Sequence, residues 1–311
     1  MTRMLSKGAQ CLNGVLVIDK PAGMSSAGVV AVVKRLTGAA RVGHAGTLDP
    51  FATGVLIVCI NQATRLARFW LHGVKTYAAR LCLGVETDTQ DVTGAVVATG
   101  FTGDISEGDI QTAMTSFVGI TEQAPPIFSA LKHQGVPLYK LARKGMPVQK
   151  PSRRVEIYRL DIQEIAVPYV RFVVTCSSGT YIRTLCMDIG RKLGCGAHLQ
   201  ELRRTASSRF TLADALTLSE LETQVEAGSI DSRLIGMAES LPDMSCFQAD
   251  KSLTDKLKYG MIITDADIPA TVMTEGASFL KVLDNSHRLL SVLCYEPLCQ
   301  RYTYCCSFAG D

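Results

Sequence analysis

Short apolar runs rich in β-branched residues recur along the chain, and Gly, Pro, Asp and Asn separate them. Such runs predict strands, because β-branched side chains pack well on a pleated surface and turn residues end it. Elsewhere apolar residues recur every three or four positions, which predicts amphipathic helices. The predicted strands are 14–18, 54–60, 75–83, 155–165 and 170–176, the last two as a hairpin; the predicted helices begin at Ser25 or Ser26, near 106 and after a Thr180 cap.

The pattern changes after about residue 240. From there the apolar runs are shorter, and they predict strands at 262–265, 270–273, 279–283 and 289–295. Such closely spaced short strands are typical of a small all-β module. A chain of 311 residues also exceeds one typical domain. We therefore expect one large domain, at 1–240, and one small domain, at 241–311.

The composition is that of a globular protein with an ample core, because 47% of the residues are hydrophobic and 20% are charged. The formal net charge of +3 is too small to indicate a nucleic-acid partner by itself. The N-terminus has no apolar signal core, and no run approaches the roughly 20 apolar residues of a membrane helix. We expect a soluble, cytoplasmic protein without membrane contact.

Cysteine usage and acidic spacing both argue against a metal site. The eleven cysteines are scattered, without a C-x-x-C pair, which fits neither a disulfide framework nor a zinc site. They suit small apolar positions in a reducing compartment. The acidic loop at 84–94 has a spacing that matches no known calcium cage, so a solvated loop is favoured over a cation site.

Basic residues are concentrated in one segment, 132–159, which contains a single acidic residue. A solvated face is one interpretation of this segment. A surface that contacts phosphates explains such a local excess better in a nearly neutral protein. The segment contains Lys132, Lys140, Arg143, Lys144, Lys150, Arg153, Arg154 and Arg159 against Glu156, with His133, Tyr139 and Tyr158 interleaved.

The stretch 41–56 carries the strongest candidate chemistry. Glycines flank His44 there, so the backbone can turn tightly or approach a ligand. Pro50 fixes its own φ and keeps Asp49 out of helical geometry. Asp49 is therefore a carboxylate on a stiff loop that leads into a buried strand. This is an active-site geometry, although Asp before Pro also commonly caps a structural turn.

Six sets of residues together resemble the TruB family of tRNA pseudouridine synthases, and the resemblance extends over nearly the whole chain. Each set alone is moderately specific, whereas their order along the chain is highly specific. The sets are Asp19-Lys20-Pro21 with Gly23 and Ser25-Ser26; Gly43 to Leu56; Lys75-Thr76-Tyr77 with Leu83-Gly84, Thr87-Asp88 and Asp91; Pro126 with Ser129 to Lys132 and Gly135 to Tyr139; Ser178 to Arg183; and Leu202-Arg203-Arg204.

The resemblance implies an α+β fold, with a mixed, mainly antiparallel sheet flanked by helices and a small C-terminal β-barrel-like PUA module for RNA binding. It also implies a thumb-like insertion at about 126–152 in the catalytic domain. The implied reaction is isomerisation of uridine 55 in the TΨC loop of tRNA to pseudouridine, with the base flipped into a pocket. No cofactor, metal or obligatory protein partner is implied, and we expect a monomer that binds the TΨC stem-loop of tRNA.

By the same resemblance, Asp49 is the catalytic carboxylate, either as a nucleophile or as a base that removes a ribose proton. Arg183 is expected to pair with Asp49 and keep it ionised. Tyr77 is expected to stack on the flipped base. Tyr181 should line the opposite side of the pocket and could pass on a proton.

The remaining implied roles concern the edges of the pocket. His44 is expected to contact the displaced tRNA loop, and Leu202 to pack against the target nucleotide. Lys20 and Pro21 are expected to support the pocket floor.

Each candidate also has a structural interpretation. Taken alone, Tyr77 and Tyr181 fit half-buried positions in a strand and a helix. Arg183 fits a structural ion pair equally well, and His44 fits a turn. The functional interpretation is favoured because all of them occupy the family's motif positions.

Three other functions are compatible with parts of the sequence. A non-catalytic tRNA-binding or tRNA-folding module is opposed by the intact Asp49 and Arg183. A catalytic subunit of a guide-RNA-dependent pseudouridylation complex is opposed by the thumb-like insertion and the small C-terminal module, which favour a stand-alone enzyme. A hydrolytic glycosidase is disfavoured, because no second carboxylate accompanies Asp49 in a matching motif.

Overall fold

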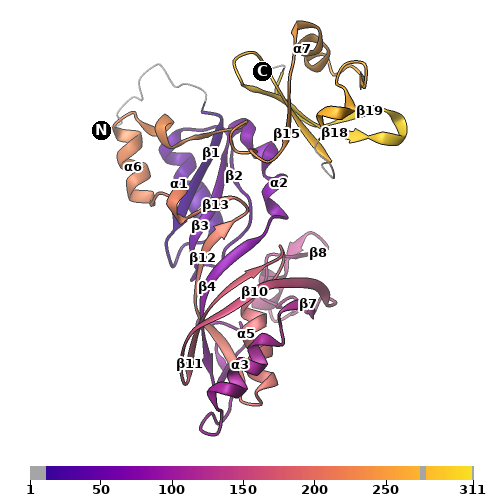
Figure 1. The fold of residues 1–311 in the computed structure, drawn as a ribbon. Coiled ribbons are helices and arrows are strands. Elements are labelled where there is room, and N and C mark those ends of the chain that lie inside the picture. The colour runs from indigo at the N-terminus through magenta and orange to yellow at the C-terminus, as the bar shows by residue number, and fades with distance from the viewer. Residues whose placement is uncertain (1–11, 274–277, 310–311) are drawn as a thin grey trace.

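A ten-stranded mixed sheet runs the length of the larger part of the molecule (Figure 1). The computed structural model describes residues 12–273 and 278–309. The strands lie in the order β14-β1-β3-β12-β4-β11-β10-β7, with β2 on β3 and β13 on β12. Their bounds are β1 Gly14–Lys20, β2 Val42–His44, β3 Thr53–Ile60, β4 Lys75–Leu83, β7 Gly119–Gln123, β10 Arg153–Ala166, β11 Tyr169–Cys176, β12 Ala197–Ser207, β13 Phe210–Thr211 and β14 Ile235–Gly236.

Strand direction confirms the predicted sheet type. In the described part of this sheet, β12 and β3 pair in parallel at Thr53 and Gly54, and the other pairings are antiparallel. The predicted hairpin is β10 and β11, and the strand predicted at 75–83 has those bounds. The sheet is therefore mixed and mainly antiparallel, as expected.

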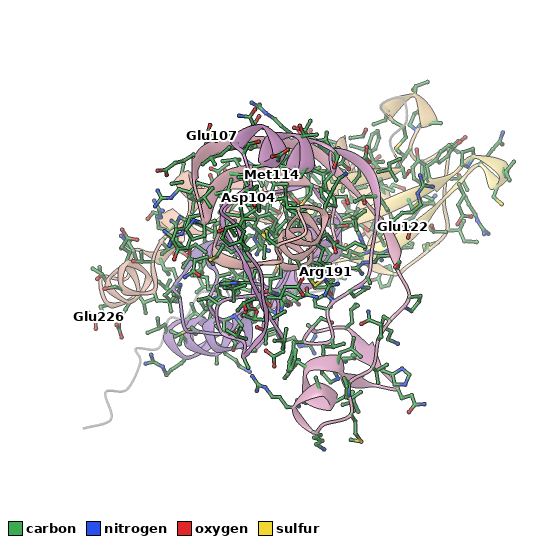
Figure 2. The ribbon with its side chains drawn as sticks, turned by 90° about the horizontal axis from the view of Figure 1, so that it is seen from below. Asp104, Glu107, Met114, Glu122, Arg191 and Glu226 are labelled. Carbon is green, nitrogen blue, oxygen red and sulfur yellow. The ribbon has the colours of Figure 1, made fainter. Side chains whose placement is uncertain are left out.

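Helices cover the sheet in two groups. The buried residues of α1 (Ser26–Thr37) and α6 (Leu218–Glu226) pack on β1 and β3, whereas α3 (Glu107–Thr115) and α5 (Ile182–Lys192) pack on β4, β10 and β11. Figure 2 shows α3 at the surface, where Glu107 is exposed and Met114 is fully buried. The side chain of Ser25 caps α1, and Gly38, at φ 65°, ends it.

Both faces of β1 and β3 are buried, which explains their continuous apolar runs. Leu16 and Ile18 of β1 face the cluster with α1. Val15 and Val17 face a second cluster, which includes Trp70 of α2 (Arg68–Leu71) and residues of the C-terminal module. The two parts of the chain therefore share a hydrophobic core, and Phe69 and Phe279 meet edge to face with ring centroids 5.2 Å apart.

The C-terminal module is a five-stranded sheet in the order β15-β17-β18-β19-β16. Its strands are β15 Ser245–Gln248, β16 Ile263–Thr264, β17 Phe279–Leu283, β18 Leu289–Glu296 and β19 Arg301–Ser307. This curled five-stranded sheet confirms the predicted small β-barrel-like module. The module is not all β, however, because α7 (Lys251–Lys258) buries Leu253 and Leu257, four positions apart, and is capped by Asp250. The predicted strand at 270–273 is also wrong: Ala270–Val272 form a 3-10 turn after Pro269.

The insertion, residues 124–152 between β7 and β10, contains β8 (Lys132–His133), β9 (Val136–Pro137) and α4 (Leu138–Arg143). Most of the predicted basic residues in and just after it are exposed, namely Lys132, Lys140, Arg143, Lys144, Arg154 and Arg159. Its positive charge is therefore available to a phosphate backbone. The remaining small sheet pairs β5 (Val85–Thr87) with β6 (Val96–Thr99). None of the described helices is long and apolar enough to cross a membrane.

Candidate active site

The loop that carries Asp49 is fixed to β1 and α1. The ammonium group of Lys20, which is fully buried, donates hydrogen bonds to the carbonyl oxygens of Pro50 at 3.0 Å and Pro21 at 2.8 Å. The Ser26 hydroxyl accepts a hydrogen bond from the Leu48 amide at 2.9 Å and donates to the Leu48 carbonyl at 3.1 Å. The residues on both sides of Asp49 are therefore held in place.

A second buried cation fixes the other end of this loop. Arg204, 1% exposed, donates to the carbonyl of Gly46 at 3.0 Å and to that of Val55 at 2.7 Å. Its backbone runs against Gly54, which has φ +100° and where a Cβ would lie 2.2 Å from the Arg204 carbonyl oxygen. Only glycine fits this close approach of β12 to β3.

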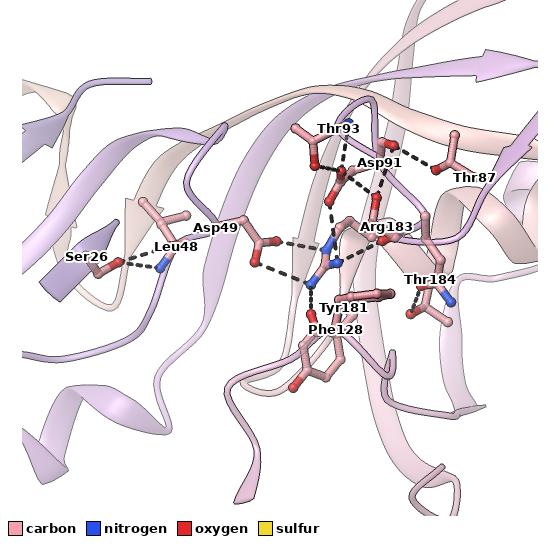
Figure 3. A network of polar contacts seen from close by, with 12 residues as sticks. Ser26, Leu48, Asp49, Thr87, Asp91, Thr93, Phe128, Tyr181, Arg183 and Thr184 are labelled. Atoms are coloured by element: carbon pink, nitrogen blue, oxygen red, sulfur yellow. Dashed lines mark hydrogen bonds and ion pairs between the residues drawn. The ribbon is translucent and has the colours of Figure 1, made fainter. Parts of the chain in front are cut away.

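Asp49 forms an ion pair with Arg183 (Figure 3). Nε of Arg183 lies 2.9 Å from Oδ2 of Asp49, and Nη2 donates to Oδ1 at 3.3 Å. The side chain of Arg183 is 4% exposed, whereas that of Asp49 is 31% exposed. The carboxylate therefore faces open space while its partner is buried behind it.

Arg183 is itself held by acceptors from two further segments, the loop at 84–94 and the insertion. Its guanidinium donates to the carbonyls of Thr89 at 2.8 Å and Phe128 at 2.9 Å, and lies 3.4 Å from Oδ2 of Asp91. Both terminal nitrogens of Arg183 thus have a fixed direction, which fixes the face that Arg183 presents to Asp49.

The loop at 84–94 differs from its prediction as a solvated segment. The side chain of Asp91 is 5% exposed, and its Oδ1 accepts hydrogen bonds from Thr89 and Thr93. The loop folds onto β12, where the Val92 amide donates to the Leu199 carbonyl at 2.9 Å. Burial of a second carboxylate beside Arg183 was missed because a turn-rich acidic loop normally faces water.

A pocket of about 360 Å³ opens beside Asp49. The structure brings five of the six predicted site residues to its wall; these are Asp49, Tyr77, Tyr181, Arg183 and Leu202. The sixth, His44, lies outside the wall, on β2, where it is half-buried. Arg204, Lys75 and Arg153 also line the pocket, so its wall combines aromatic rings with positive charge.

Burial shifts the titration of the groups around the pocket. It raises the pKa of Asp49, and the Arg183 charge opposes that rise. Burial lowers the pKa of Lys20 to about 8 and that of Lys75 to about 8. Burial also raises the pKa of Tyr77, which keeps its hydroxyl group neutral, and the Arg204 charge opposes that rise. The pKa of His44 is lowered, first by burial and then by Arg204.

Within the described residues, no group of three or more His, Cys, Asp or Glu side chains is placed to hold a metal ion. The charges around the pocket are instead those of Asp49 and the nearby Lys and Arg side chains.

The sequence matches the TruB family pseudouridylate synthase N-terminal domain over residues 34–182, and the tRNA pseudouridylate synthase B C-terminal domain over residues 183–241. It is 44% identical over 272 residues to tRNA pseudouridine synthase B of Syntrophotalea carbinolica, covering 87% of this chain and 89% of that protein. The chain belongs to the TruB family. The protein of the same name from Geobacillus thermodenitrificans is 40% identical, over 81% of this chain and 86% of that one.

The chain is also similar to solved structures of protein chains that belong to larger assemblies. A chain in the structure of an H/ACA ribonucleoprotein bound to a substrate RNA containing 2'-deoxyuridine has a TM-score of 0.69 and 26% identity, covering 92% of this chain and 78% of that one. A chain of a Cbf5-Nop10-Gar1 complex has a TM-score of 0.67 at the same identity, covering 92% of this chain and 79% of that one.

The pocket lies across both TruB-family regions. Asp49 and Tyr77 come from the first region, whereas Arg183 and Leu202 come from the second. The ion pair between Asp49 and Arg183 therefore joins the two regions at the pocket.

The start of α5 differs from its prediction. The N-cap is Tyr181, whose side chain does not cap the helix, and the hydroxyl of Thr180 donates to the Ser177 carbonyl at 3.0 Å instead. Thr180 therefore stabilises the preceding turn. Gln123 and Phe128 contact Tyr181 and Arg183 and were not predicted, because the signal is a tertiary contact rather than a local motif. Arg153 was predicted only as part of the basic segment, and the structure places it over the Tyr181 ring.

Proposed function

We propose that this TruB-family chain isomerises uridine 55 in the TΨC loop of tRNA to pseudouridine, as a monomer in the cytoplasm and without a protein partner. The proposal rests chiefly on one observation: Asp49 is fixed at the pocket and faces it, with Arg183 buried behind it. The names of its relatives support tRNA as the substrate. Sequence identity to the H/ACA ribonucleoprotein chain is 26%, against 44% to a tRNA pseudouridine synthase B, which favours the stand-alone enzyme over a guide-dependent subunit.

The reaction moves the ribosyl bond within one nucleotide. The bond between N1 and C1' breaks, the uracil turns, and a bond forms between C5 and C1'. The proton on C5 is released and N1 gains one, so no electron donor or acceptor is needed. An ionised Asp49 can serve in either of two ways: by attack at C1' or by removal of a ribose proton.

The substrate base must leave the stacked tRNA loop, at a cost of a few kcal/mol. We assign the compensating contacts to the pocket wall, with Tyr77 stacking on the base and Leu202 excluding water from the nucleotide. Tyr181 lines the pocket, and we assign to it the transfer of a proton. His44 lies outside the pocket, as a residue that contacts the displaced loop would.

The rest of the chain supplies RNA affinity in this proposal. Residues 1–240 form the catalytic domain, and residues 241–311 form a PUA-like RNA-binding module. The exposed basic residues of the insertion contact the phosphate backbone, so tRNA affinity falls as salt concentration rises.

The test uses purified protein alone with an unmodified tRNA transcript labelled with tritium at C5 of its uridines. Tritium release is expected, and a transcript carrying cytidine at position 55 should release none. If no tritium is released while the tRNA still binds, the stand-alone synthase is wrong, and a binding module or guide-dependent subunit remains.

A further inference from the structure

Two residues at the base of the insertion face each other across strands β7 and β10. Gln123 is the last residue of β7 and Arg153 is the first of β10, and their Cα atoms are register partners. The insertion therefore leaves the sheet at Gln123 and returns at Arg153. Gln123 is 3% exposed, which is unusual for a neutral amide unless its hydrogen bonds are made.

Gln123 makes both of its hydrogen bonds to the backbone of one residue, Tyr181. Its Oε1 accepts from the Tyr181 amide at 2.7 Å, and its Nε2 donates to the Tyr181 carbonyl at 3.0 Å. The two bonds fix the peptide groups on both sides of the Tyr181 Cα. They therefore fix the direction in which the side chain leaves the backbone.

Arg153 contacts the other part of the same residue. Its guanidinium lies over the Tyr181 ring, 5.1 Å from the ring centroid, and it donates a hydrogen bond to the Gly179 carbonyl. Arg153 also lines the pocket. The backbone of Tyr181 is thus held by one register partner, and its ring is held by the other.

Local structure supplies only part of this restraint. Tyr181 is the N-cap of α5, and among the described residues no N-cap side-chain hydrogen bond fixes the start of that helix. The Leu185 amide donates to the Tyr181 carbonyl at 3.0 Å, but the Tyr181 amide has no partner within the helix. The contacts from Gln123 and Arg153 complete this partial local restraint.

We propose that Gln123 and Arg153 are positioning residues, which hold Tyr181 against the pocket in the orientation that the isomerisation needs. This inference rests on the proposed function, because Tyr181 matters only if the pocket receives the target nucleotide. It makes the base of the insertion part of the catalytic apparatus, in addition to the RNA contact made by the exposed basic surface.

The test compares Gln123→Met with a matched control, Gln149→Met. Gln149 also donates a side-chain hydrogen bond to backbone, at the Pro125 carbonyl, but no contact with Tyr181 or Arg183 is recorded for it in the described structure. The single-turnover rate at saturating enzyme, the tRNA dissociation constant and the thermal midpoint are measured for each protein. Gln123→Met is expected to slow the single-turnover rate by roughly tenfold, with tRNA affinity unchanged within about twofold. The Tyr181 amide then loses the acceptor that Gln123 supplies, and the Tyr181 carbonyl keeps only its bond from the Leu185 amide.

Gln149→Met should leave the rate within about twofold of wild type, because the two hydrogen bonds that it loses, to the Pro125 and Lys150 carbonyls, hold the insertion and not Tyr181. Arg153→Lys keeps the charge and loses the planar stacking on the ring, so it should slow the rate in the same way. If Gln123→Met does not fold, Gln123→Glu takes its place, because it keeps the size and the acceptor but loses the donor to the Tyr181 carbonyl.

A double-mutant cycle separates positioning from a merely structural role. With Tyr181→Ala there is no ring to orient, so adding the Gln123 substitution should change the rate by less than about twofold. If the Gln123 substitution slows the rate as much in Tyr181→Ala as it does in the wild type, the inference is overturned. It is also overturned if Gln123→Met alone lowers tRNA affinity and the thermal midpoint along with the rate. Activity in the wild type with no effect of Gln123→Met would also overturn it, whereas an inactive wild type would instead contradict the proposed function.

Discussion

Nε of Arg183 lies 2.9 Å from Oδ2 of Asp49, although 134 positions separate the two residues in the sequence. Arg183 is buried and its other nitrogens are occupied by Thr89, Phe128 and Asp91. It therefore acts on Asp49 as a fixed charge. Burial alone would favour a neutral carboxyl, so the ionised form of Asp49 depends on this charge.

Replacement of Arg183 by Lys should change the pH dependence of the reaction. Burial raises the pKa of Asp49, and the bidentate Arg183 opposes that rise. Lysine opposes it less, because it offers a point charge without the fork. The pKa of Asp49 then rises further, and the acid limb of the rate profile moves to higher pH. Single-turnover rates from pH 5 to 9 should show a larger loss at pH 6 than at pH 8; an unmoved limb would be contrary evidence.

Asp91→Asn should move the acid limb of the pH–rate profile to lower pH. The negative charge of Asp91 raises the pKa of Asp49, so its removal lowers that pKa and extends activity to lower pH. Stability should fall by about 1–3 kcal/mol, because a buried carboxylate that accepts hydrogen bonds from Thr89 and Thr93 loses its charge. Urea unfolding measures the second effect. A limb that moves to higher pH would refute the assigned electrostatics.

Gly54→Ala tests the junction of β3 and β12, and Gly119→Ala, in β7, is its matched control. Their φ angles are +100° and +102°, so both alanines carry backbone strain of about 1–3 kcal/mol. At Gly54 the new Cβ also meets the Arg204 carbonyl oxygen at 2.2 Å, whereas nothing lies within 4 Å at Gly119. Gly54→Ala should therefore lose at least about 2 kcal/mol more in unfolding free energy. Equal losses in the two variants would show that the close approach does not matter.

The sequence predicted the central strands well because both faces of β1 and β3 are buried, so their residues form unbroken apolar runs. It predicted α1 because Ser25 and Gly38 provide local start and stop signals. It missed α7, where two leucines on a short basic helix give a weak period, and it missed the 3-10 turn after Pro269.

The site residues also divide into those with a local sequence signal and those without one. Asp49 stands out locally, because proline and glycines around it produce a stiff loop. Asp91 and Gln123 were not predicted as part of the site, since their importance comes from contacts with Arg183 and Tyr181 far along the chain. No local pattern carries that information. His44 was expected among the site residues, and the structure places it on β2, outside the pocket wall.

The most direct test of the central claim compares Asp49→Asn with Asp91→Asn in the tritium-release assay at pH 8, with tRNA affinity measured in parallel. Both carboxylates contact Arg183, but Asp49 lines the pocket and Asp91 lies behind it. Asp49→Asn should slow pseudouridine formation by roughly a thousandfold or more with tRNA binding retained, as expected for the loss of a reacting group. Asp91→Asn should retain most of the rate at that pH. Substantial activity in Asp49→Asn would contradict the assignment of Asp49 as the reacting carboxylate.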